Sequence, residues 1–334
     1  MGSTLIVLKN GVAYDMSELV QSIKWGGAKS SMPRSIEVTM LDSDGHGHER
    51  PKIDVMEGNQ VLFQWNGNEL FQGIFVNTSQ TASRTGTYKA YDFGMYLSKN
   101  MGTFTYKKKT ATFIFTDICK EFGIDCTAVE TGYTIPDLTM PNTTAADAIW
   151  SALAKTYRAT GRRYYVLAQN GKLKLIARAD NVLRLVVEEG TNILDFTRQV
   201  SIEDTYTRVK LYSDANKELA SAIDTSIESK IGIMQYTEQA DSKDKAAALK
   251  ATAKNLLAIK SQSEETLEVE VIGDATVYSG VALYFNVPYL GITKTYYVDE
   301  DEHEFKGEMH TMRLKLNAIN DVYGADDDDD DEES

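Results

Sequence analysis

The 334-residue sequence has few cysteines, few prolines and no long apolar run. It contains 2 cysteines and 5 prolines, and no apolar stretch approaches the roughly 18 residues of a transmembrane helix. Two thiols in a chain of this length indicate a reducing compartment, so we expect Cys119 and Cys126 to be reduced and structural. The N-terminus lacks the basic start and the cleavage site of a signal peptide. The sequence predicts an ordered protein, made in a cytoplasm and not inserted into a membrane.

Positive charge is also scarce. Formal net charge is −14, and the run Asp326–Asp331 with Glu332 and Glu333 supplies eight of these charges, which leaves −6 for the rest. Beyond the short run 107–109 there is no basic stripe, so specific nucleic-acid binding is not expected. An acidic or neutral surface can still line a passage through which DNA moves, because attraction to phosphates would stall transit.

Motifs for catalysis and cofactor binding are missing as well. The chain has no G-x-S-x-G elbow, phosphate loop, dinucleotide fingerprint or Cys-x-x-Cys pair. His46 and His48 alternate on one segment and could bind a metal with a neighbouring carboxylate, but a solvated loop explains them as well. His303 and His310 flank a turn and are expected to face each other on a partly buried strand pair. The sequence predicts no catalytic, cofactor-binding or metal-binding residue.

The clearest local signal is EGNQVLFQWNGNELFQGIF, residues 57–75. Its Asn-Gly pair between two apolar runs predicts a β-hairpin with a two-residue turn. A two-residue loop places Phe63 opposite Leu70 and Leu62 opposite Phe71, which puts apolar side chains on both faces. We therefore expect a second layer, from this chain or a neighbour, to cover the other face.

The pattern along the chain predicts three domains and a tail. Residues 1–100 read as short strands separated by turns, typical of a small antiparallel barrel or sandwich. Residues 101–197 mix helices and strands. Residues 198–324 begin with a strand in SIEDTYTRVKLYS, followed by a polar connection through about residue 230, one added helix at about 241–260 and further strands. The acidic segment 325–334 cannot offset its ordering entropy by burial, so we expect it to be disordered.

Two helices are expected in the middle domain. The first lies in ATFIFTDICKEF and ends at Gly123, the second begins with Thr143 or Thr144 as its N-cap and ends at Gly161. A hairpin around Asn170-Gly171 follows.

The two β-rich regions show an internal echo. GNQVLFQW followed by ELFQGIFV resembles SGVALYFNV followed by LGITKTYYV, and the two pairs occupy corresponding places in their regions. Chance similarity among β segments explains the echo equally well, although the matching positions favour duplication. The candidate subunit or partner contacts are Leu62, Trp65 and Phe71 in the first hairpin and Tyr284 and Tyr289 in its counterpart.

The order of GNQVLFQWNGNELFQGIF, YKAYDFGMYLSKN, PNTTAADAIWSALAKTYRATGRRYYV and HEFKGEMHTMRLKL resembles the baseplate hub proteins of contractile phage tails. The likeness is greatest to the PBSX-type hub, a family also found in phage-tail-like bacteriocins, and covers nearly the whole chain. It lies in order and spacing, since each motif alone is common. None of the matching positions is catalytic in the family, and the acidic tail is not expected of it. The matching positions are Gly58, Val61, Phe63, Phe71, Gly73, Asp92, Leu97, His303, His310 and Met312.

The resemblance implies an α+β fold in which two tube-like β-barrel domains with an inserted α/β domain form a trimeric ring. Three chains would give six similar units around a channel and adapt a trimeric spike to a hexameric tail tube. The implied partners are the spike, the tail tube protein, a tape-measure protein and a peptidoglycan-binding tail protein. The implied location is the virion tail baseplate or a phage-tail-like particle.

Two other functions are consistent with the composition. One is a tail-associated cell-wall hydrolase, although no segment is left over to house it. The other is a carbohydrate-binding tail module, although the long repeats usual in fibre proteins are missing. The sequence does not distinguish a phage from a bacteriocin.

Overall fold

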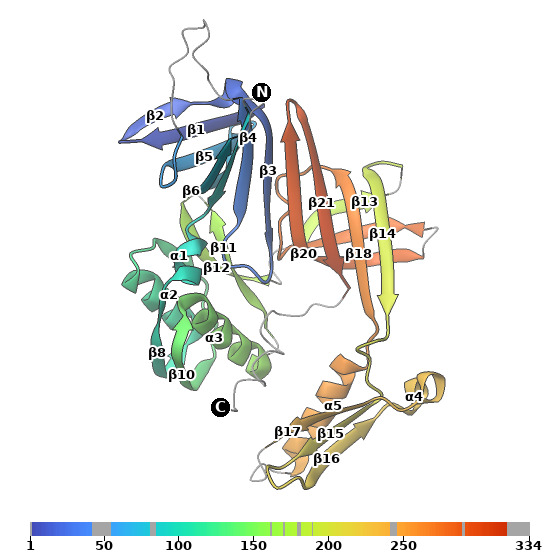
Figure 1. Cartoon of the computed structure of the whole chain (residues 1–334). Coiled ribbons are helices and arrows are strands. Elements are labelled where there is room, and N and C mark those ends of the chain that lie inside the picture. Colours follow the sequence, from blue (N-terminus) through green and yellow to red (C-terminus); the bar gives the residue numbers. More distant parts are fainter. Residues whose placement is uncertain are drawn as a thin grey trace, which may run out of the picture. The chain divides into compact units, whose positions relative to one another are not determined.

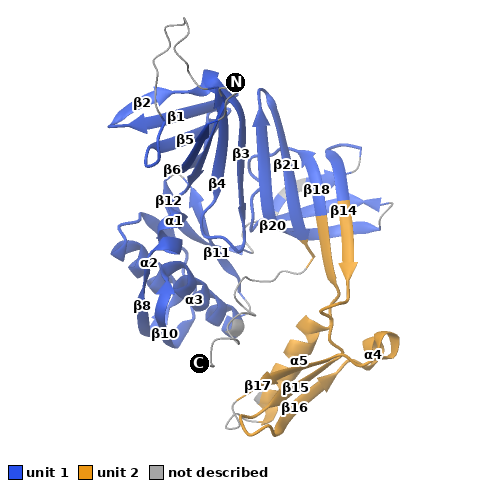
Figure 2. Cartoon of the chain, in the orientation of Figure 1, with its two compact units in different colours: residues 1–196, 268–316, 320–334 blue, residues 197–267, 317–319 orange. Residues whose placement is uncertain are grey.

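The computed structural model describes residues 2–41, 55–80, 85–160, 162–169, 171–178, 182–188, 190–240, 246–288 and 291–318 (Figure 1). The fold is mostly β, with several sheets. Among these residues, no helix has the length and apolar character to span a bilayer. The chain forms two compact units (Figure 2): the first comprises residues 1–196, 268–316 and 320–334, the second residues 197–267 and 317–319.

The first β module, β1 to β7, is one antiparallel sheet in the order β3-β4-β7-β6-β5-β1-β2. The predicted turn at Asn66-Gly67 is confirmed, since both residues have positive φ, 51° and 81°. Alternating side chains form its core, among them the fully buried Leu5, Ile23 and Phe63. The elements are β1 (Ser3–Lys9), β2 (Val12–Asp15), a 3-10 turn (Ser17–Leu19), β3 (Val20–Ala28), β4 (Ser35–Leu41), β5 (Gln60–Trp65), β6 (Asn68–Gln80) and β7 (Thr85–Tyr91).

The register of the β5–β6 hairpin corrects the sequence-based expectation. Phe63 pairs with Phe71, and Leu62 pairs with Gln72, because a bulge at Leu70 adds one residue to β6. The two phenylalanines therefore share one buried face, whereas Leu62 and Leu70 are only partly buried. The predicted pairing of Leu62 with Phe71 is wrong, because the bulge shifts every later side chain of β6 to the other face.

The α/β part follows, and both predicted helices are confirmed. Gly123, at φ 65°, ends α2 in the left-handed conformation. Thr144 caps α3: the Asp147 N–H donates to the Thr144 hydroxyl over 3.1 Å, and that hydroxyl donates to the Asp147 carboxylate over 2.5 Å. Gly161 and Asn170 lie outside the described residues. The elements are α1 (Gly94–Lys99), β8 (Met101–Thr110), α2 (Ala111–Glu121), β9 (Cys126–Ala128), β10 (Thr134–Thr144), α3 (Ala145–Thr160), β11 (Tyr164–Gln169) and β12 (Lys172–Ala177).

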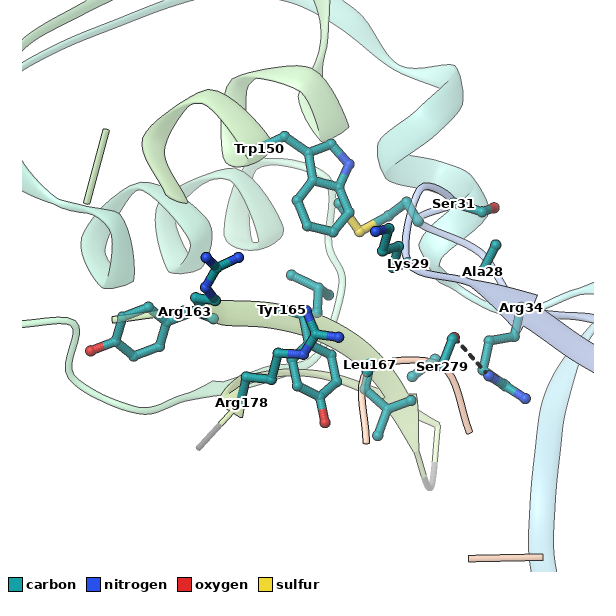
Figure 3. Close-up of a pocket in the computed structure, with 15 residues that line it drawn as sticks. Ala28, Lys29, Ser31, Arg34, Trp150, Arg163, Tyr165, Leu167, Arg178 and Ser279 are labelled. Atoms are coloured by element: carbon teal, nitrogen blue, oxygen red, sulfur yellow. Dashed lines mark hydrogen bonds between the residues drawn. The ribbon is translucent and has the colours of Figure 1, made fainter. Parts of the chain in front are cut away.

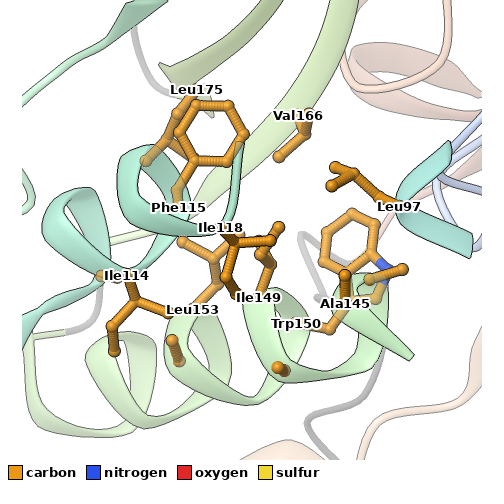
Figure 4. Close-up of a cluster of buried hydrophobic side chains, with 14 of the residues drawn as sticks. Leu97, Ile114, Phe115, Ile118, Ala145, Ile149, Trp150, Leu153, Val166 and Leu175 are labelled. Carbon is orange, nitrogen blue, oxygen red and sulfur yellow. The ribbon is translucent and has the colours of Figure 1, made fainter. Parts of the chain in front are cut away.

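A single apolar core holds this part together (Figure 4). Phe115 and Ile118 of α2 lie in the same buried cluster as Ile149 and Leu153 of α3, with β11 and β12 side chains covering them. The spacing of three or four residues in each helix confirms the predicted apolar faces. Both cysteines are free, and burial raises the pKa of the Cys119 thiol, which keeps it protonated.

The second β module repeats the strand order of the first. Its spatial order β14-β18-β21-β20-β19-β13 matches β3-β4-β7-β6-β5-β1, strand for strand. The modules differ in the direction of one strand, because β13 is parallel to β19 whereas β1 is antiparallel to β5. The sequence echo falls on the matching hairpins β5–β6 and β19–β20. The strands are β13 (Val182–Glu188), β14 (Ile193–Ser201), β18 (Glu264–Ile272), β19 (Ala282–Val287), β20 (Ile292–Lys306) and β21 (Met309–Asn317).

The second unit is a small sheet covered by a helix, within residues 197–267. β15 pairs antiparallel with β16 and parallel with β17, and α5 packs Leu249, Ala253 and Leu257 against them. The helix expected at about 241–260 is confirmed, although residues 241–245 lie outside the described chain. The expected polar connection is wrong, because β16 and α4 lie in it. The elements are β15 (Arg208–Tyr212), β16 (Glu218–Ile223), α4 (Thr225–Ile231), β17 (Gln235–Gln239) and α5 (Ala246–Lys260).

The cap of α3 gives a stability prediction. Thr144→Ala removes the acceptor for the Asp147 N–H and should lower the free energy of unfolding by about 1 kcal/mol. Thr143→Ala, which loses only a 3.3 Å hydroxyl contact to the Asp147 carboxylate, is the matched control and should cost a few tenths. Urea unfolding measures both; equal losses would contradict the assignment of the cap to Thr144.

Candidate functional site

The two β modules are joined edge to edge into one sheet, and the junction is formed by β3 and β20 (Figure 1). Residues 292–297 of β20 pair with β19, and residues 300–305 pair antiparallel with residues 28 to 23 of β3. A long strand of the second module therefore covers the edge strand of the first. Because β3 and this stretch of β20 pair with each other, neither module has an open edge here.

Within the described residues, the strands that match β3 and β20 have edges that no strand pairs with. β14, which matches β3, pairs only with β18 in the described part of the chain. β6, which matches β20, pairs with β5 up to Ile74, and Phe75 exchanges backbone hydrogen bonds with residues 58 and 59. In the described segments, β7 is the only strand that pairs with residues 77–80. Leu194 and Val200 of β14 are 55% and 54% exposed. An open edge with exposed apolar side chains is a template for pairing with another chain.

Two glycines allow the junction strands to approach. A Cβ on Gly26 would clash with the carbonyl oxygen of Asp301, and a Cβ on Gly27 would lie 2.9 Å from the Arg34 side chain. Gly26 and Gly27 are not among the described residues with a positive φ. Glycine is therefore needed at these positions because a side chain would not fit, and not because of the backbone conformation.

A buried ion pair connects the modules at this point. Arg34 donates to both carboxylate oxygens of Asp301, over 2.9 and 2.5 Å, and to the Ser279 hydroxyl over 3.3 Å. Its guanidinium also lies 4.3 Å from the centre of the Trp25 ring. Burial disfavours the Asp301 carboxylate, but the charge of Arg34 and the hydrogen bonds from His303 and Arg34 outweigh burial and hold the pKa of Asp301 well below its usual range.

Asp92 positions the segment that carries Arg34. Its carboxylate accepts the Arg34 backbone N–H over 3.0 Å and the Gly94 N–H over 2.8 Å. Burial raises the pKa of Asp92 to about 7, although the two hydrogen bonds lower it. The carboxyl group thus links β4 to the start of α1.

The histidine pair lies in an aromatic cluster beside the ion pair. His303 is fully buried; its Nδ1 lies 2.9 Å from His310 Nε2, and its Nε2 lies 3.0 Å from the Val277 carbonyl oxygen. The carbonyl can only accept, so Nε2 carries the proton and Nδ1 accepts from His310. Phe305 stacks on His310 at 4.1 Å and meets Trp65 at 4.9 Å. The predicted facing pair is confirmed.

No group of three metal-ligating side chains occurs in the described segments. His46 and His48 lie outside those segments.

The exposed face of the joined sheet forms a groove of about 730 Å³. Along β3 the exposed Lys24 lies between the buried Ile23 and Trp25, so alternation places charge on this face and apolar groups in the cores. The described lining carries four cations, Lys24, Lys89, Arg313 and Lys315, and five carboxylates, Glu37, Glu268, Glu300, Asp301 and Glu302, which leaves the groove nearly neutral and unsuited to holding a polyanion. Three ion pairs hold several of these side chains. The pairs are Lys24–Glu302 at 3.3 Å, Lys315–Glu300 at 3.4 Å and Arg313–Glu270 at 3.1 Å.

The structure distributes the five predicted interface residues among different environments. Trp65 and Phe71 are 9% and 4% exposed and belong to the first module's own core. Leu62 is partly buried and Tyr284 is 40% exposed. Tyr289 lies outside the described residues. As subunit or partner contacts, the five remain a prediction.

Sequence reasoning missed Arg34 and Asp301, the pair at the centre of the junction. They lie 267 residues apart, and no motif marks either one. The only available signal was the Gly26-Gly27 pair inside a strand, which indicates close backbone approach.

Comparisons with known proteins agree on the class. Residues 23–317 match the family model described as YQBQ-like. The Phage-like element PBSX protein XkdQ of Bacillus subtilis is 39% identical over 306 residues, 90% of this chain and 93% of that protein. The fold is similar to that of the prophage MuSo2 43 kDa tail protein from Shewanella oneidensis, with TM-score 0.71, 12% identity, and 94% and 97% of the two chains covered.

A further solved structure is similar in fold, with TM-score 0.53, 8% identity, and 89% and 73% of the two chains covered. It is the E. coli c3393 protein, described as a component of the type VI secretion system with structural similarity to T4 bacteriophage tail proteins gp27 and gp5.

Fold and relatives define a phage tail protein of the PBSX type, which confirms the resemblance seen in the sequence. The chain belongs to the YQBQ-like family.

The histidine pair gives a pH prediction. Burial, together with His303, lowers the pKa of His310 from 6.5 to about 4, so the unfolded chain binds more protons than the folded chain between these pH values. The free energy of unfolding should therefore fall as pH drops through this window. His310→Gln keeps an N–H donor for His303 without titrating, so its urea midpoint should fall less.

Thr311→Ser is the control for the adjacent position and should keep the wild-type pH dependence. Equal pH slopes for the wild type and His310→Gln would contradict the assigned role of His310.

Proposed function

We propose that this protein is a structural baseplate hub of a phage tail or phage-tail-like particle. Three copies close a ring of six β modules, which adapts a trimeric spike to a hexameric tail tube. The ring forms the central channel on which the tube assembles. The chain acts by assembly and not as an enzyme.

The repeated strand order, together with its one internal junction, carries this proposal. β3 of the first module already pairs with β20 of the second, and no strand in the described part of the chain pairs with the corresponding edges of β14 and β6. When β14 of one copy pairs with β6 of the next, the same contact is repeated between chains. Such a head-to-tail contact closes a ring of fixed size only when each step turns by the same angle.

The domain organisation follows from this arrangement. We infer tube-like domains within residues 1–100 and 198–324 and an α/β domain within 101–197, with β13 and β14 adding to the second tube-like domain. The nearly neutral groove across β3 and β20 would face the channel, where DNA or a tape-measure protein passes without sticking.

The fold likeness to a protein described as similar to gp27 and gp5 supports spike and tube proteins as partners. A peptidoglycan-binding tail protein is a further expected partner. The proposed location is the tail baseplate.

A paired-substitution experiment tests the ring. Light scattering over a concentration series should give the mass of three chains for the wild type, alone or with spike or tube protein. The double variant Leu194→Lys with Val200→Lys places two charges on the β14 edge. The concentration at which the trimer dissociates to the monomer should rise at least tenfold.

Ile233→Lys is the matched control, since Ile233 is 64% exposed but lies outside both β modules, and it should leave the mass unchanged. A wild type that stays monomeric with both partners, or a β14 double variant that assembles like the wild type, would contradict the ring.

A further inference from the structure

Among the described residues that line a small pocket in the first unit, four side chains are cationic and none is acidic (Figure 3). It lies where the β3–β4 loop, α3 and the β11–β12 hairpin meet the residues before β19, and has a volume of about 40 Å³, enough for one small polar group. Its charged lining residues are Lys29, Arg34, Arg163 and Arg178. In a chain of net charge −14, such a lining is unusual.

Two of the four cations are already balanced from outside the pocket. Arg34 is held by Asp301, and Lys29 lies 3.2 Å from the Asp299 carboxylate. Arg163 and Arg178 both lie against tyrosine rings, and the unused hydrogen-bond donor belongs to Arg163.

Arg163 retains unused hydrogen-bonding capacity. It donates to the Tyr157 hydroxyl and its guanidinium lies 4.0 Å from the centre of that ring, but its buried Nη1 has no hydrogen-bond partner in the described chain. No described carboxylate forms an ion pair with it. Arg178, 6% exposed, lies 4.7 Å from the centre of the Tyr297 ring. A carboxylate entering here would supply the missing acceptor and offset the charge.

The chain itself carries a run of carboxylates that can reach this pocket. β20 ends at Lys306 and β21 begins at Met309, so counting back along the hairpin sets Leu316 opposite Asp299. Asp299 contacts Lys29, which lines the pocket. Ten residues lead from Leu316 to Asp326, and they span at most about 35 Å.

We propose that the pocket is a carboxylate-binding site and that the acidic tail, residues 326–333, is its occupant. Opposite charge, proximity of the chain exit and a buried donor without an acceptor all favour the same ligand. The site is independent of ring formation, so it can hold even if the proposed hub function fails.

Peptide binding to the full-length chain tests the site. In the parent variant each tail acid is replaced by its amide: Asp→Asn at 326–331, Glu332→Gln and Glu333→Gln. A fluorescent peptide of residues 325–334 is titrated against it at low salt and followed by anisotropy. Saturable binding is expected, and the wild-type chain, whose own tail competes, should bind the peptide at least tenfold more weakly.

Arg163→Gln in the parent variant should weaken peptide binding at least tenfold. Arg162→Gln removes the same charge from the exposed neighbour outside the pocket and should leave binding unchanged. Arg163→Lys keeps the charge but removes the guanidinium Nη1 donor, so it should weaken binding less than Arg163→Gln and more than Arg162→Gln, which tests the site even if the glutamine variant folds poorly.

Equal loss in the Arg162 and Arg163 variants would overturn the proposal, since binding would then reflect overall charge. Displacement of the peptide by an equal concentration of inorganic phosphate would also overturn it, because the pocket would then accept any anion.

Discussion

The fold depends on the antiparallel pairing of β3 with β20. This pairing turns two sheets, separated in sequence by the whole α/β part, into one. It requires glycine at 26, because a side chain there would clash with the Asp301 backbone, and it buries the Arg34–Asp301 ion pair. Removing one partner of a buried pair leaves an uncompensated charge, so the pair enforces this pairing more than it adds net stability.

Local signals made much of the fold predictable. Asn66-Gly67 forms the predicted turn and Gly123 ends the predicted helix, both through their positive φ. Thr144 starts the next helix through its side chain, as expected. The register of β6 was not predictable, because nothing in the sequence marks the bulge at Leu70. The small strand and helix of the second unit were missed, because their polar exposed faces hide the apolar periodicity.

The site was less predictable than the fold. Its residues come together only through tertiary pairing, as Arg34 and Asp301 do across 267 positions. Trp65 and Phe71 were predicted as contacts because the hairpin was expected to carry apolar side chains on both faces, yet both lie in the core of the first module. The two-residue turn sets His310 opposite Phe305, so the contact between His303 and His310 is diagonal across the hairpin, and only the proximity of the two histidines was predictable.

The central claim is that one chain supplies two equivalent ring units. Electron cryomicroscopy of the isolated assembly, or of the chain bound to its spike, measures this directly. The account predicts a closed ring of three chains in which β14 of each copy pairs with β6 of the next, giving six β modules at nearly equal angular steps. A ring of six chains, or one in which only a single β module of each chain lines the channel, would contradict it.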